Sequence, residues 1–208
     1  MANGEPAHDP ALLTPAGERN LPHILGFLAP HLPATGRLLE VATGTGGHGL
    51  ALARTHPGLA VLPTDFNDDA VKALADWQAA HGPDNFLPPL RLDAAEAATW
   101  ADGQFDVVLC INMIHISPWS ATIGLMKLAG ERLVRPGGLL ALYGPYVEAD
   151  VETAPSNIAF HESLRARDPA WGLRALEDVV SEARSNGLRH THRAALPANN
   201  LGLLFRSA

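Results

Sequence analysis

Residues 38–49, with the sequence LLEVATGTGGHG, constrain the fold of this chain more than any other segment. The apolar run that ends at Val41 predicts a buried strand, and the glycines after it predict a sharp turn that opens a helix. Glycine lets the backbone turn tightly and approach a ligand without a Cβ in the way, and the first N–H groups of a helix are unpaired. The segment therefore predicts a nucleotide-cofactor pocket, with a plain strand-to-helix turn as the alternative.

The rest of the chain alternates between short apolar runs and helical patterns, which predicts a parallel sheet covered by helices. Towards the C-terminus, two helices precede two strands joined by a short turn, and these strands should pair antiparallel. We therefore expect an α/β fold: a Rossmann-like, seven-stranded, mostly parallel sheet with an antiparallel C-terminal hairpin and helices on both faces. The expected strands are 37–42, 59–63, 86–92, 105–111, 139–143, 188–195 and 201–206, and the expected helices are 18–31, 47–56, one from a cap at Asn67 to 81, 118–133, 157–166 and 175–185.

The length of 208 residues predicts one domain. We place it at 18–208, after a flexible N-terminal segment, 1–17, that lacks periodicity. The net charge of −7 disfavours non-specific nucleic-acid binding, which needs a basic surface. Polar residues interrupt every apolar segment, so we expect no membrane partner, and no secretory signal is visible. The single cysteine, Cys110, excludes an internal disulfide framework, and we expect a buried thiol in a cytoplasmic protein.

Several motifs resemble those of the class I S-adenosylmethionine (SAM)-dependent methyltransferases, over about residues 36–145. The full chain also resembles a methyltransferase-like family, the domain of unknown function numbered 938. One departure is Ala42, where the wider class usually has glycine, and this should narrow the pocket. The segments that carry the resemblance are 18–20 (ERN), 111–119 (INMIHISPW), 143–145 (YGP), 154–157 (APSN), 163–168 (SLRARD) and 197–201 (PANNL).

Acidic residues follow three neighbouring strands, at the edge of the sheet where ligands bind in open α/β folds. Glu40 can reach the ammonium group that SAM carries, and Asp65 can accept both ribose hydroxyls. The resemblance implies that Asp93 accepts from the adenine amine, and for each acid a turn or helix-capping role is the alternative. The expected SAM-binding residues are Glu40, Ala42, Gly44, Gly46, Asp65, Phe66, Asp93, Ala94 and Asn112.

Methyl transfer to a small-molecule acceptor, with oxygen as the favoured atom, is the reaction that the resemblance implies. His115 is the candidate general base, because histidine titrates near working pH, with a structural role as the alternative. Arginine forks bind carboxylate or phosphate, so we expect an anionic group on the acceptor unless these arginines form surface ion pairs. The expected substrate-binding residues are Arg19, Asn20, Tyr143, Tyr146, Asn157, Arg165, Arg174 and Asn199.

Two other functions remain as alternatives. The glycine pattern and Asp65 also fit an NAD(P)-dependent oxidoreductase, although neither Lys72 nor Lys127 follows a tyrosine at the spacing of short-chain dehydrogenases. A non-catalytic protein that binds the cofactor and a partner is the second alternative. We expect no metal site, because the ten histidines lack ligand spacing.

Overall fold

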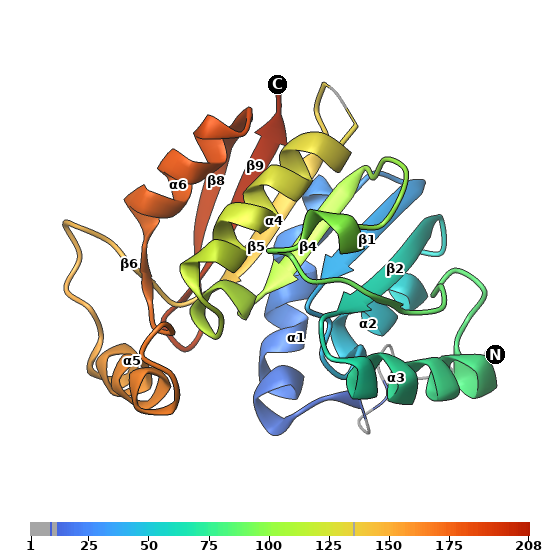
Figure 1. The fold of residues 1–208 in the computed structure, drawn as a ribbon, viewed down its shortest axis with the longest axis horizontal. Helices are drawn as coiled ribbons and strands as arrows, with labels where there is room; N and C mark the ends of the chain where they lie inside the picture. The colour runs from blue at the N-terminus through green and yellow to red at the C-terminus, as the bar shows by residue number, and fades with distance from the viewer. Residues whose placement is uncertain (1–8, 10–11, 135) are drawn as a thin grey trace.

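The computed structural model of the protein describes residues 9, 12–134 and 136–208 (Figure 1). A seven-stranded sheet has the order β3-β2-β1-β4-β5-β9-β8, in which the first five strands are parallel and β9 pairs antiparallel with both of its neighbours, β5 and β8. The expected fold class is therefore confirmed. The strands of this sheet are β1 (Gly36–Val41), β2 (Leu59–Asp65), β3 (Leu90–Arg91), β4 (Val107–Ile111), β5 (Leu139–Gly144), β8 (Leu188–Leu196) and β9 (Asn200–Ser207).

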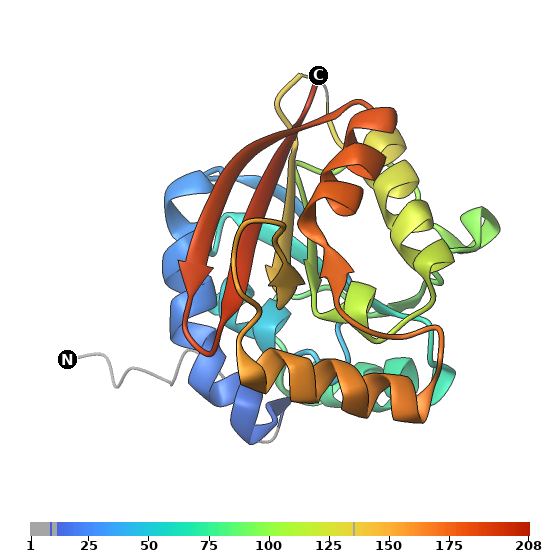
Figure 2. The ribbon, with the colours of Figure 1, turned by 90° about the vertical axis from the view of Figure 1, so that its left-hand side faces the viewer.

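Helices cover both faces of this sheet (Figure 2). The apolar side chains of α1 (Pro15–Leu28), α2 (Gly47–Thr55) and α3 (Asp68–His81) pack on one face. Those of α4 (Trp119–Arg132) and α6 (Leu176–Ser185) pack on the other face. Three short 3-10 helices, η2 (Ala29–His31), η3 (Ala97–Thr99) and η4 (Met113–His115), complete these layers. Because both faces are covered, the central strands β1, β2, β4 and β5 are mostly buried, as a parallel sheet requires, whereas the edge strands β3 and β8 are largely exposed.

Capping side chains explain where two of the helices begin. The Asn67 carboxamide oxygen accepts hydrogen bonds from the backbone N–H groups of Asp69 (2.9 Å) and Ala70 (3.1 Å), so it is the N-cap of α3. The hydroxyl of Thr14 accepts from Gly17 N–H (3.1 Å) and is the N-cap of α1. Helix α1 therefore begins earlier than expected. In the N-terminal segment predicted to be flexible, residues 15–17 are helical and Leu12 is buried, whereas residues 1–8, 10 and 11 lie outside the described residues.

The third strand is much shorter than expected. Only Leu90 and Arg91 pair with β2, and Phe86 forms an isolated bridge to Val61. Pro88 and Pro89 lie between these two contacts and have no N–H group to donate to a neighbouring strand. The remaining expected elements lie within a few residues of their predicted bounds.

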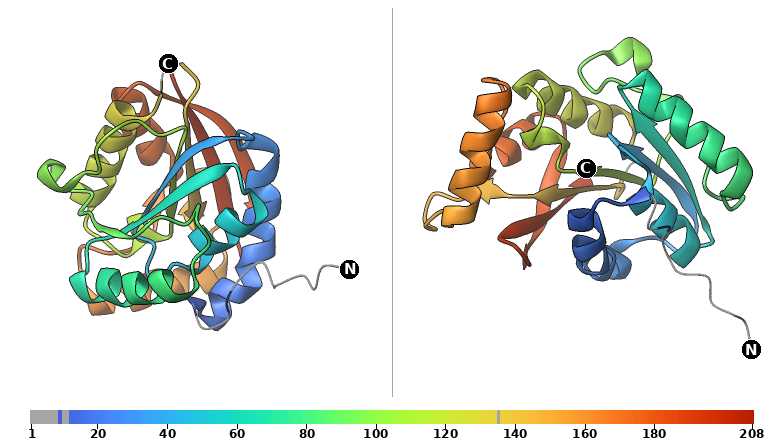
Figure 3. Two further views of the ribbon diagram at one scale, coloured as in Figure 1. Left: turned by 90° about the vertical axis from the view of Figure 1, so that its right-hand side faces the viewer. Right: turned by 90° about the horizontal axis from the view of Figure 1, so that it is seen from below.

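A separate unit lies at the carboxyl edge of the sheet, between β5 and α6. In it, β6 (Tyr146–Val147) pairs with β7 (Arg174–Ala175), and α5 (Pro155–Arg167) forms the connection between them. Seen from below, α5 and α3 lie at opposite ends of that edge (Figure 3, right). This unit closes the edge on the side of β8 and β9, where Asn157 of α5 donates a hydrogen bond to the β8–β9 turn (2.9 Å).

Candidate functional site

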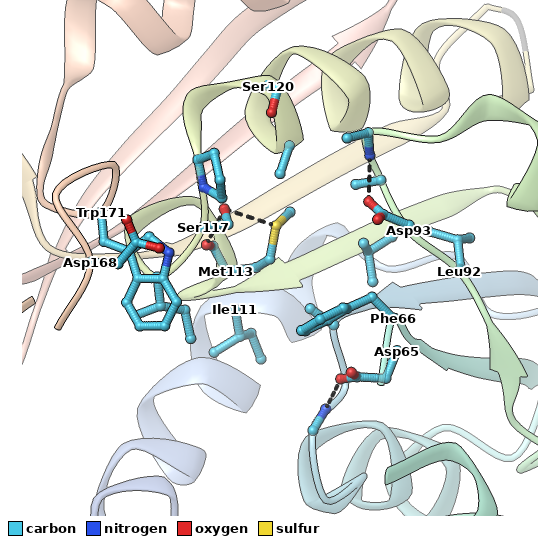
Figure 4. A pocket seen from close by; sticks show the side chains of 18 residues that line it. Asp65, Phe66, Leu92, Asp93, Ile111, Met113, Ser117, Ser120, Asp168 and Trp171 are labelled. Carbon is cyan, nitrogen blue, oxygen red and sulfur yellow. Dashed lines mark hydrogen bonds between the residues drawn. The ribbon is translucent and has the colours of Figure 1, made fainter. Parts of the chain in front are cut away.

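A cavity of about 500 Å³ opens at the carboxyl ends of β1, β2, β3 and β4. It lies where the strand order reverses, between β1 and β4, which is the usual ligand site of an open α/β sheet. We call it the main cavity; its volume falls in the range typical of small-molecule sites. Its walls are formed by Val41, Ala42, Gly44, Asp65, Phe66, Leu92, Asp93, Ala94, Ala95, Ile111, Met113, Ile116, Ser117, Pro118, Ser120, Ala121, Asp168 and Trp171 (Figure 4).

Asp65 holds the glycine turn at the floor of the main cavity. One of its carboxylate oxygens accepts from Gly44 N–H (2.9 Å) and the other from Asn67 N–H (3.0 Å) (Figure 4). Because Asn67 caps α3, Asp65 is not needed as the helix cap. An ionised carboxylate has about four acceptor positions, so each oxygen keeps capacity for a ligand hydroxyl. Its place at the end of β2 agrees with the expected ribose contact.

Ala42, Gly44 and Gly46 all have left-handed backbone conformations, with φ values of 58°, 59° and 86°. Alanine is strained in this region, which explains why glycine is the usual residue at the position of Ala42. Ala42 and Gly44 line the main cavity, as expected. Gly46 does not: a Cβ there would meet the side chain of Leu74 at 2.6 Å, so this glycine is required for packing of the turn on α3.

Glu40 lies beneath the turn and not in the cavity wall. Its side chain is 1% exposed and accepts a hydrogen bond from the hydroxyl of Thr43 (2.5 Å) and one from the backbone of Gly49. Burial raises the pKa of the Glu40 carboxyl to about 7. The expected direct contact with a cofactor ammonium is corrected: Glu40 supports the turn, because the lack of a Cβ on Gly49 lets the carboxylate come against the start of α2.

The wall opposite the glycine turn carries Asp93 and Ala94, and their predicted contact with adenine stays a prediction. One carboxylate oxygen of Asp93 accepts from Ala95 N–H (2.9 Å) (Figure 4). Phe66 lies between this wall and Asp65, and its ring is 63% exposed although it lines the cavity. An exposed aromatic ring at a pocket is suited to stack on a planar ligand.

His115 is fully buried behind the wall of the main cavity, at 0% exposure. No described residue forms a hydrogen bond with either of its ring nitrogens. Its ring meets that of Tyr146 edge-on, with centroids 4.8 Å apart, and burial lowers the pKa of the imidazole to about 3. The expectation that His115 stands in the cavity as a general base is therefore corrected. Asn112, with φ of 62°, is also absent from the lining residues and lies beside Gly144.

The arginines do not form the expected anion site. Arg174 donates to the backbone carbonyls of Ile114 (2.9 Å), Ser117 (2.6 Å) and Ala170 (2.8 Å), so its guanidinium joins two loops. Arg165 is exposed and does not line the main cavity. Arg19 and Asn20, on α1, also do not line this cavity. No lysine or arginine is among the described residues that line it.

Three of the expected substrate-binding residues meet in a second, smaller cavity of about 180 Å³. Tyr146, Asn157 and Asn199 line it together with other residues of the C-terminal part of the chain. Tyr143 does not: it is buried among the residues that pack under α1, and burial raises the pKa of its hydroxyl to about 12. The sequence prediction therefore combined residues that belong to two cavities and to the core.

Asp168 and Trp171 line the main cavity. From the sequence, Trp171 belongs to the region after the fifth strand that often covers the acceptor site in this architecture, whereas Asp168 was not predicted as a site residue. They lie in the loop between α5 and β7, on the side of the cavity away from Asp93 (Figure 4). Asp168 accepts from Ala170 N–H (2.8 Å), and the guanidinium of Arg167 covers the indole of Trp171 at 4.9 Å. Residues 163–168 carry part of the family resemblance. Their contact with the main cavity could not be predicted, because they lie far from β4 along the chain.

Among the described residues, no group of three or more histidine, cysteine, aspartate or glutamate side chains is arranged to hold a metal ion. In the same part of the chain, no helix has the length and hydrophobicity needed to span a membrane. Cys110 is buried, as expected.

Comparison with known proteins relates this geometry to a family and to a fold. The model of the family described as "Protein of unknown function (DUF938)" matches residues 12–207. Similar solved structures include PigF with SAH, at 14% identity and a TM-score of 0.76, with 92% of this chain and 56% of that chain covered. A putative O-methyltransferase from Nostoc punctiforme matches at 17% identity and a TM-score of 0.77, covering 91% and 56% of the two chains.

A putative sarcosine dimethylglycine methyltransferase from Galdieria sulphuraria matches over more of its own length. The identity is 14%, the TM-score is 0.74, and 93% of this chain and 87% of that chain are covered. At these identities the likeness establishes a methyltransferase-like fold. The chain spans little more than half the length of PigF and of the Nostoc protein.

Proposed function

The chain belongs to the DUF938 family, and we propose that it catalyses SAM-dependent methyl transfer to a small-molecule acceptor. The proposal is based on the geometry of the main cavity. One observation carries the proposal. Asp65, at the end of β2, accepts from Gly44 N–H in the turn after β1, and both line a cavity at the β1–β4 reversal. The likeness to PigF, whose structure contains SAH (S-adenosylhomocysteine, the demethylated form of SAM), supports the same ligand here.

The residues of the main cavity fit the parts of SAM. Asp65 would accept from the ribose hydroxyls, and Asp93, one strand further along the edge, would accept from the adenine amine. Phe66, with its exposed ring, would stack on the adenine. These contacts would hold the cofactor at the carboxyl ends of β1, β2 and β3.

When bound, SAM supplies an electrophilic methyl group on a positively charged sulfur. The acceptor atom would take this methyl group, the electron pair of the methyl–sulfur bond would stay on sulfur, and the proton of an acceptor hydroxyl would pass to solvent. The chain's own contribution is alignment of the two reactants and exclusion of water.

Oxygen is the acceptor atom that we propose, supported by the likeness to a putative O-methyltransferase. The anionic group expected from the sequence is not part of the proposal. The donors of Arg174 are engaged by three carbonyls, and Arg165 lies outside the cavity wall. The three carboxylates of that wall, Asp65, Asp93 and Asp168, would repel an anion.

Calorimetric titration of the purified chain with SAM and SAH, and in parallel with NAD and NADP, tests the proposal. We expect SAM and SAH to bind and the two dinucleotides to give no heat of binding. Asp69→Ala is a suitable control for variants of Asp65, because Asp69 is exposed at the start of α3 and does not line the cavity. Binding of NAD alone would contradict the proposal and support the oxidoreductase alternative.

Catalysis needs a second measurement. Production of SAH from SAM in the presence of a panel of small hydroxylated compounds should exceed the background with at least one of them. Tight SAM binding without transfer to any compound of a broad panel would favour the non-catalytic alternative.

A further inference from the structure

We propose that the second cavity is the acceptor subsite of this methyltransferase, and that it takes a ring-sized group rich in hydrogen-bond donors, such as an amine or a hydroxylated ring, without a carboxylate or phosphate. The inference rests on the proposed function. The second cavity is lined by Tyr146, Glu148, Val151, Glu152, Thr153, Ala154, Asn157, Arg193, Ala195, Leu196, Asn199, Asn200 and Leu201. It lies between the end of β6, the start of α5 and the β8–β9 turn. Figure 2 shows the start of α5 close to this turn.

The charges of this wall disfavour an anion. Arg193 is the only lysine or arginine among its described residues, and Glu148 binds it through two contacts, Nε to Oε2 (3.0 Å) and Nη2 to Oε1 (2.6 Å). The fork of the guanidinium is therefore already occupied by a carboxylate. Glu152 adds a second carboxylate, so the wall has a net charge of about −1, counting one arginine and two glutamates.

The amide groups of the wall use their N–H groups on the protein. Asn157 donates to the carbonyl of Asn199 (2.9 Å), and Asn199 donates to the hydroxyl of Ser156 (3.1 Å). Asn200 donates to the carbonyls of Pro197 (3.1 Å) and Ala198 (3.3 Å). Each amide therefore uses its N–H groups on the protein, and no described residue donates to the oxygen of Asn157, although that residue is only 8% exposed. Free carbonyl and carboxylate oxygens in a cavity wall select a ligand with N–H or O–H groups.

The size of the cavity limits the group that enters it. A cavity of about 180 Å³ is slightly larger than one of about 150 Å³, which accommodates benzene in an engineered protein. A single ring with one or two polar substituents therefore fits, and a second SAM or a nucleotide does not.

A pair of buried rings separates this cavity from the main one. Tyr146 lines the second cavity, and its ring meets that of His115 with centroids 4.8 Å apart. Met113 and Ile116, on either side of His115 in the sequence, line the main cavity. Both nitrogens of His115 and the hydroxyl of Tyr146 lack a partner among the described residues. Buried polar atoms of this kind require an explanation, and an acceptor hydroxyl or amine between the two cavities would supply the missing hydrogen bonds.

The space for His115 depends on Gly144. A Cβ on Gly144 would meet Nε2 of His115 at 2.5 Å and Oδ1 of Asn112 at 3.2 Å. The imidazole, the carboxamide of Asn112 and the end of β5 therefore meet at the carboxyl edge, between the two cavities. This gives His115 and Tyr146 the role of positioning residues for the acceptor, and they form the partition that must open for transfer.

Ligand-observed NMR on the full chain saturated with SAH tests the subsite with three matched probes: benzylamine, benzyl alcohol and benzoate. We expect benzylamine and benzyl alcohol to bind with dissociation constants in the millimolar range, which is typical for fragments of this size, and benzoate to bind at least about tenfold more weakly than benzylamine. Glu152→Lys should remove or reverse the preference for benzylamine over benzoate, because it reverses an exposed charge in the wall without touching the core.

Glu162→Lys is the matched control: Glu162 is exposed on α5, the helix that follows Glu152, and is not part of the cavity wall, so the preference should stay unchanged. Equal binding of benzylamine and benzoate, no binding of any probe, or an unchanged preference in Glu152→Lys would each overturn the subsite. The SAH titration is independent of this result. If SAH fails to bind, the proposed function fails, and the probe preferences are still measured on the SAH-free chain.

Discussion

The main cavity and the second cavity differ in how the chain builds them. The main cavity is formed mostly by residues 41–121, at the ends of four successive parallel strands, and backbone groups satisfy its carboxylates. The second cavity is formed by residues 146–201, which come from β6, the segment after it, α5 and the C-terminal hairpin. Between them stand His115 and Tyr146, whose polar atoms have no partner among the described residues.

We interpret this difference between the two cavities in terms of the ligands that they would hold. A satisfied, backbone-built site suits an invariant ligand, because its geometry is fixed by the sheet itself. Buried polar atoms without partners cost stability, so they are expected where a ligand completes the hydrogen bonds. The four non-glycine residues with positive φ in the described chain, Ala42, Asn112, Ala198 and Asn199, all lie at or beside these two cavities or the partition. Backbone strain of this kind concentrates at functional sites.

The largest expected effect concerns the main cavity. Asp65→Ala should weaken SAH binding by at least about 100-fold, because it removes the acceptor for the ribose hydroxyls and the hydrogen bond that holds Gly44. Calorimetry measures this change, and Asp69→Ala should bind SAH like the parent chain. An affinity within about threefold of the parent in Asp65→Ala would show that the main cavity is not organised as we infer.

The next effect concerns the support beneath that cavity. The pKa of Glu40 is raised from 4.5 to about 7 in the folded chain, so the folded state binds the extra proton between these pH values. The contribution of Glu40 to the free energy of unfolding is therefore greatest at low pH, and about 3 kcal/mol is lost as the pH rises from 4.5 to 7. The Glu40→Gln variant has no carboxyl at this position to ionise. Its free energy of unfolding, relative to that of the parent, should therefore rise between pH 4.5 and 7.

Denaturant unfolding of both proteins at several pH values measures this difference. The comparison with the parent is needed because His48 and His115 have lowered pKa values, about 4 and about 3, and contribute stability that is lost as the pH falls below 6.5. These opposing contributions cancel in the difference between the variant and the parent. A difference that stays constant from pH 4.5 to 7 would contradict the buried, titrating carboxyl.

A smaller effect is expected where the two loops of the acceptor side are joined. Arg174→Ala removes the hydrogen bonds to the carbonyls of Ile114, Ser117 and Ala170 and should cost about 2 kcal/mol, since the guanidinium is only partly buried. For a chain of this length the Tm should fall by roughly 4–8 °C. Thermal unfolding measures the change, and Arg165→Ala, an exposed arginine of α5, should shift the Tm by much less. Equal decreases of the Tm in the two variants would contradict the role of Arg174 in joining the two loops.

The smallest change in stability, and the most informative one, is expected at the partition. His115→Leu replaces two unpartnered ring nitrogens by apolar atoms, so the free energy of unfolding at neutral pH should stay within about 1 kcal/mol of the parent or increase. SAH affinity should be unchanged, whereas methyl transfer to an accepted substrate should fall sharply. Unfolding measurements, calorimetry and SAH production separate these quantities. A stable variant that retains full turnover would exclude His115 from acceptor positioning.

The main features of the fold could be predicted from local sequence patterns. Alternating apolar runs and helices define the parallel sheet, Asn67 marks the start of α3, and the short turn before Asn200 defines the hairpin. The third strand could not be predicted in full, because Pro88 and Pro89 disrupt pairing within an otherwise apolar run. Asp65 and Asp93 could be placed in the cavity because the ends of parallel strands meet at one edge.

The sequence by itself determined the sheet, its ligand-binding edge and the residues at the strand ends, because local patterns mark each strand and helix and the carboxyl ends of parallel strands meet at one edge. Only the tertiary structure decided that Glu40 is buried under the turn, that Arg174 binds backbone carbonyls, and that Asp168 lines the main cavity. These outcomes depend on which loop each side chain meets. For Arg174 and Asp168, that pairing is set by the contact of β7 and the loop before it with η4, between segments some 60 residues apart, as in the hydrogen bonds from Arg174 to Ile114 and from Gly172 N–H to His115.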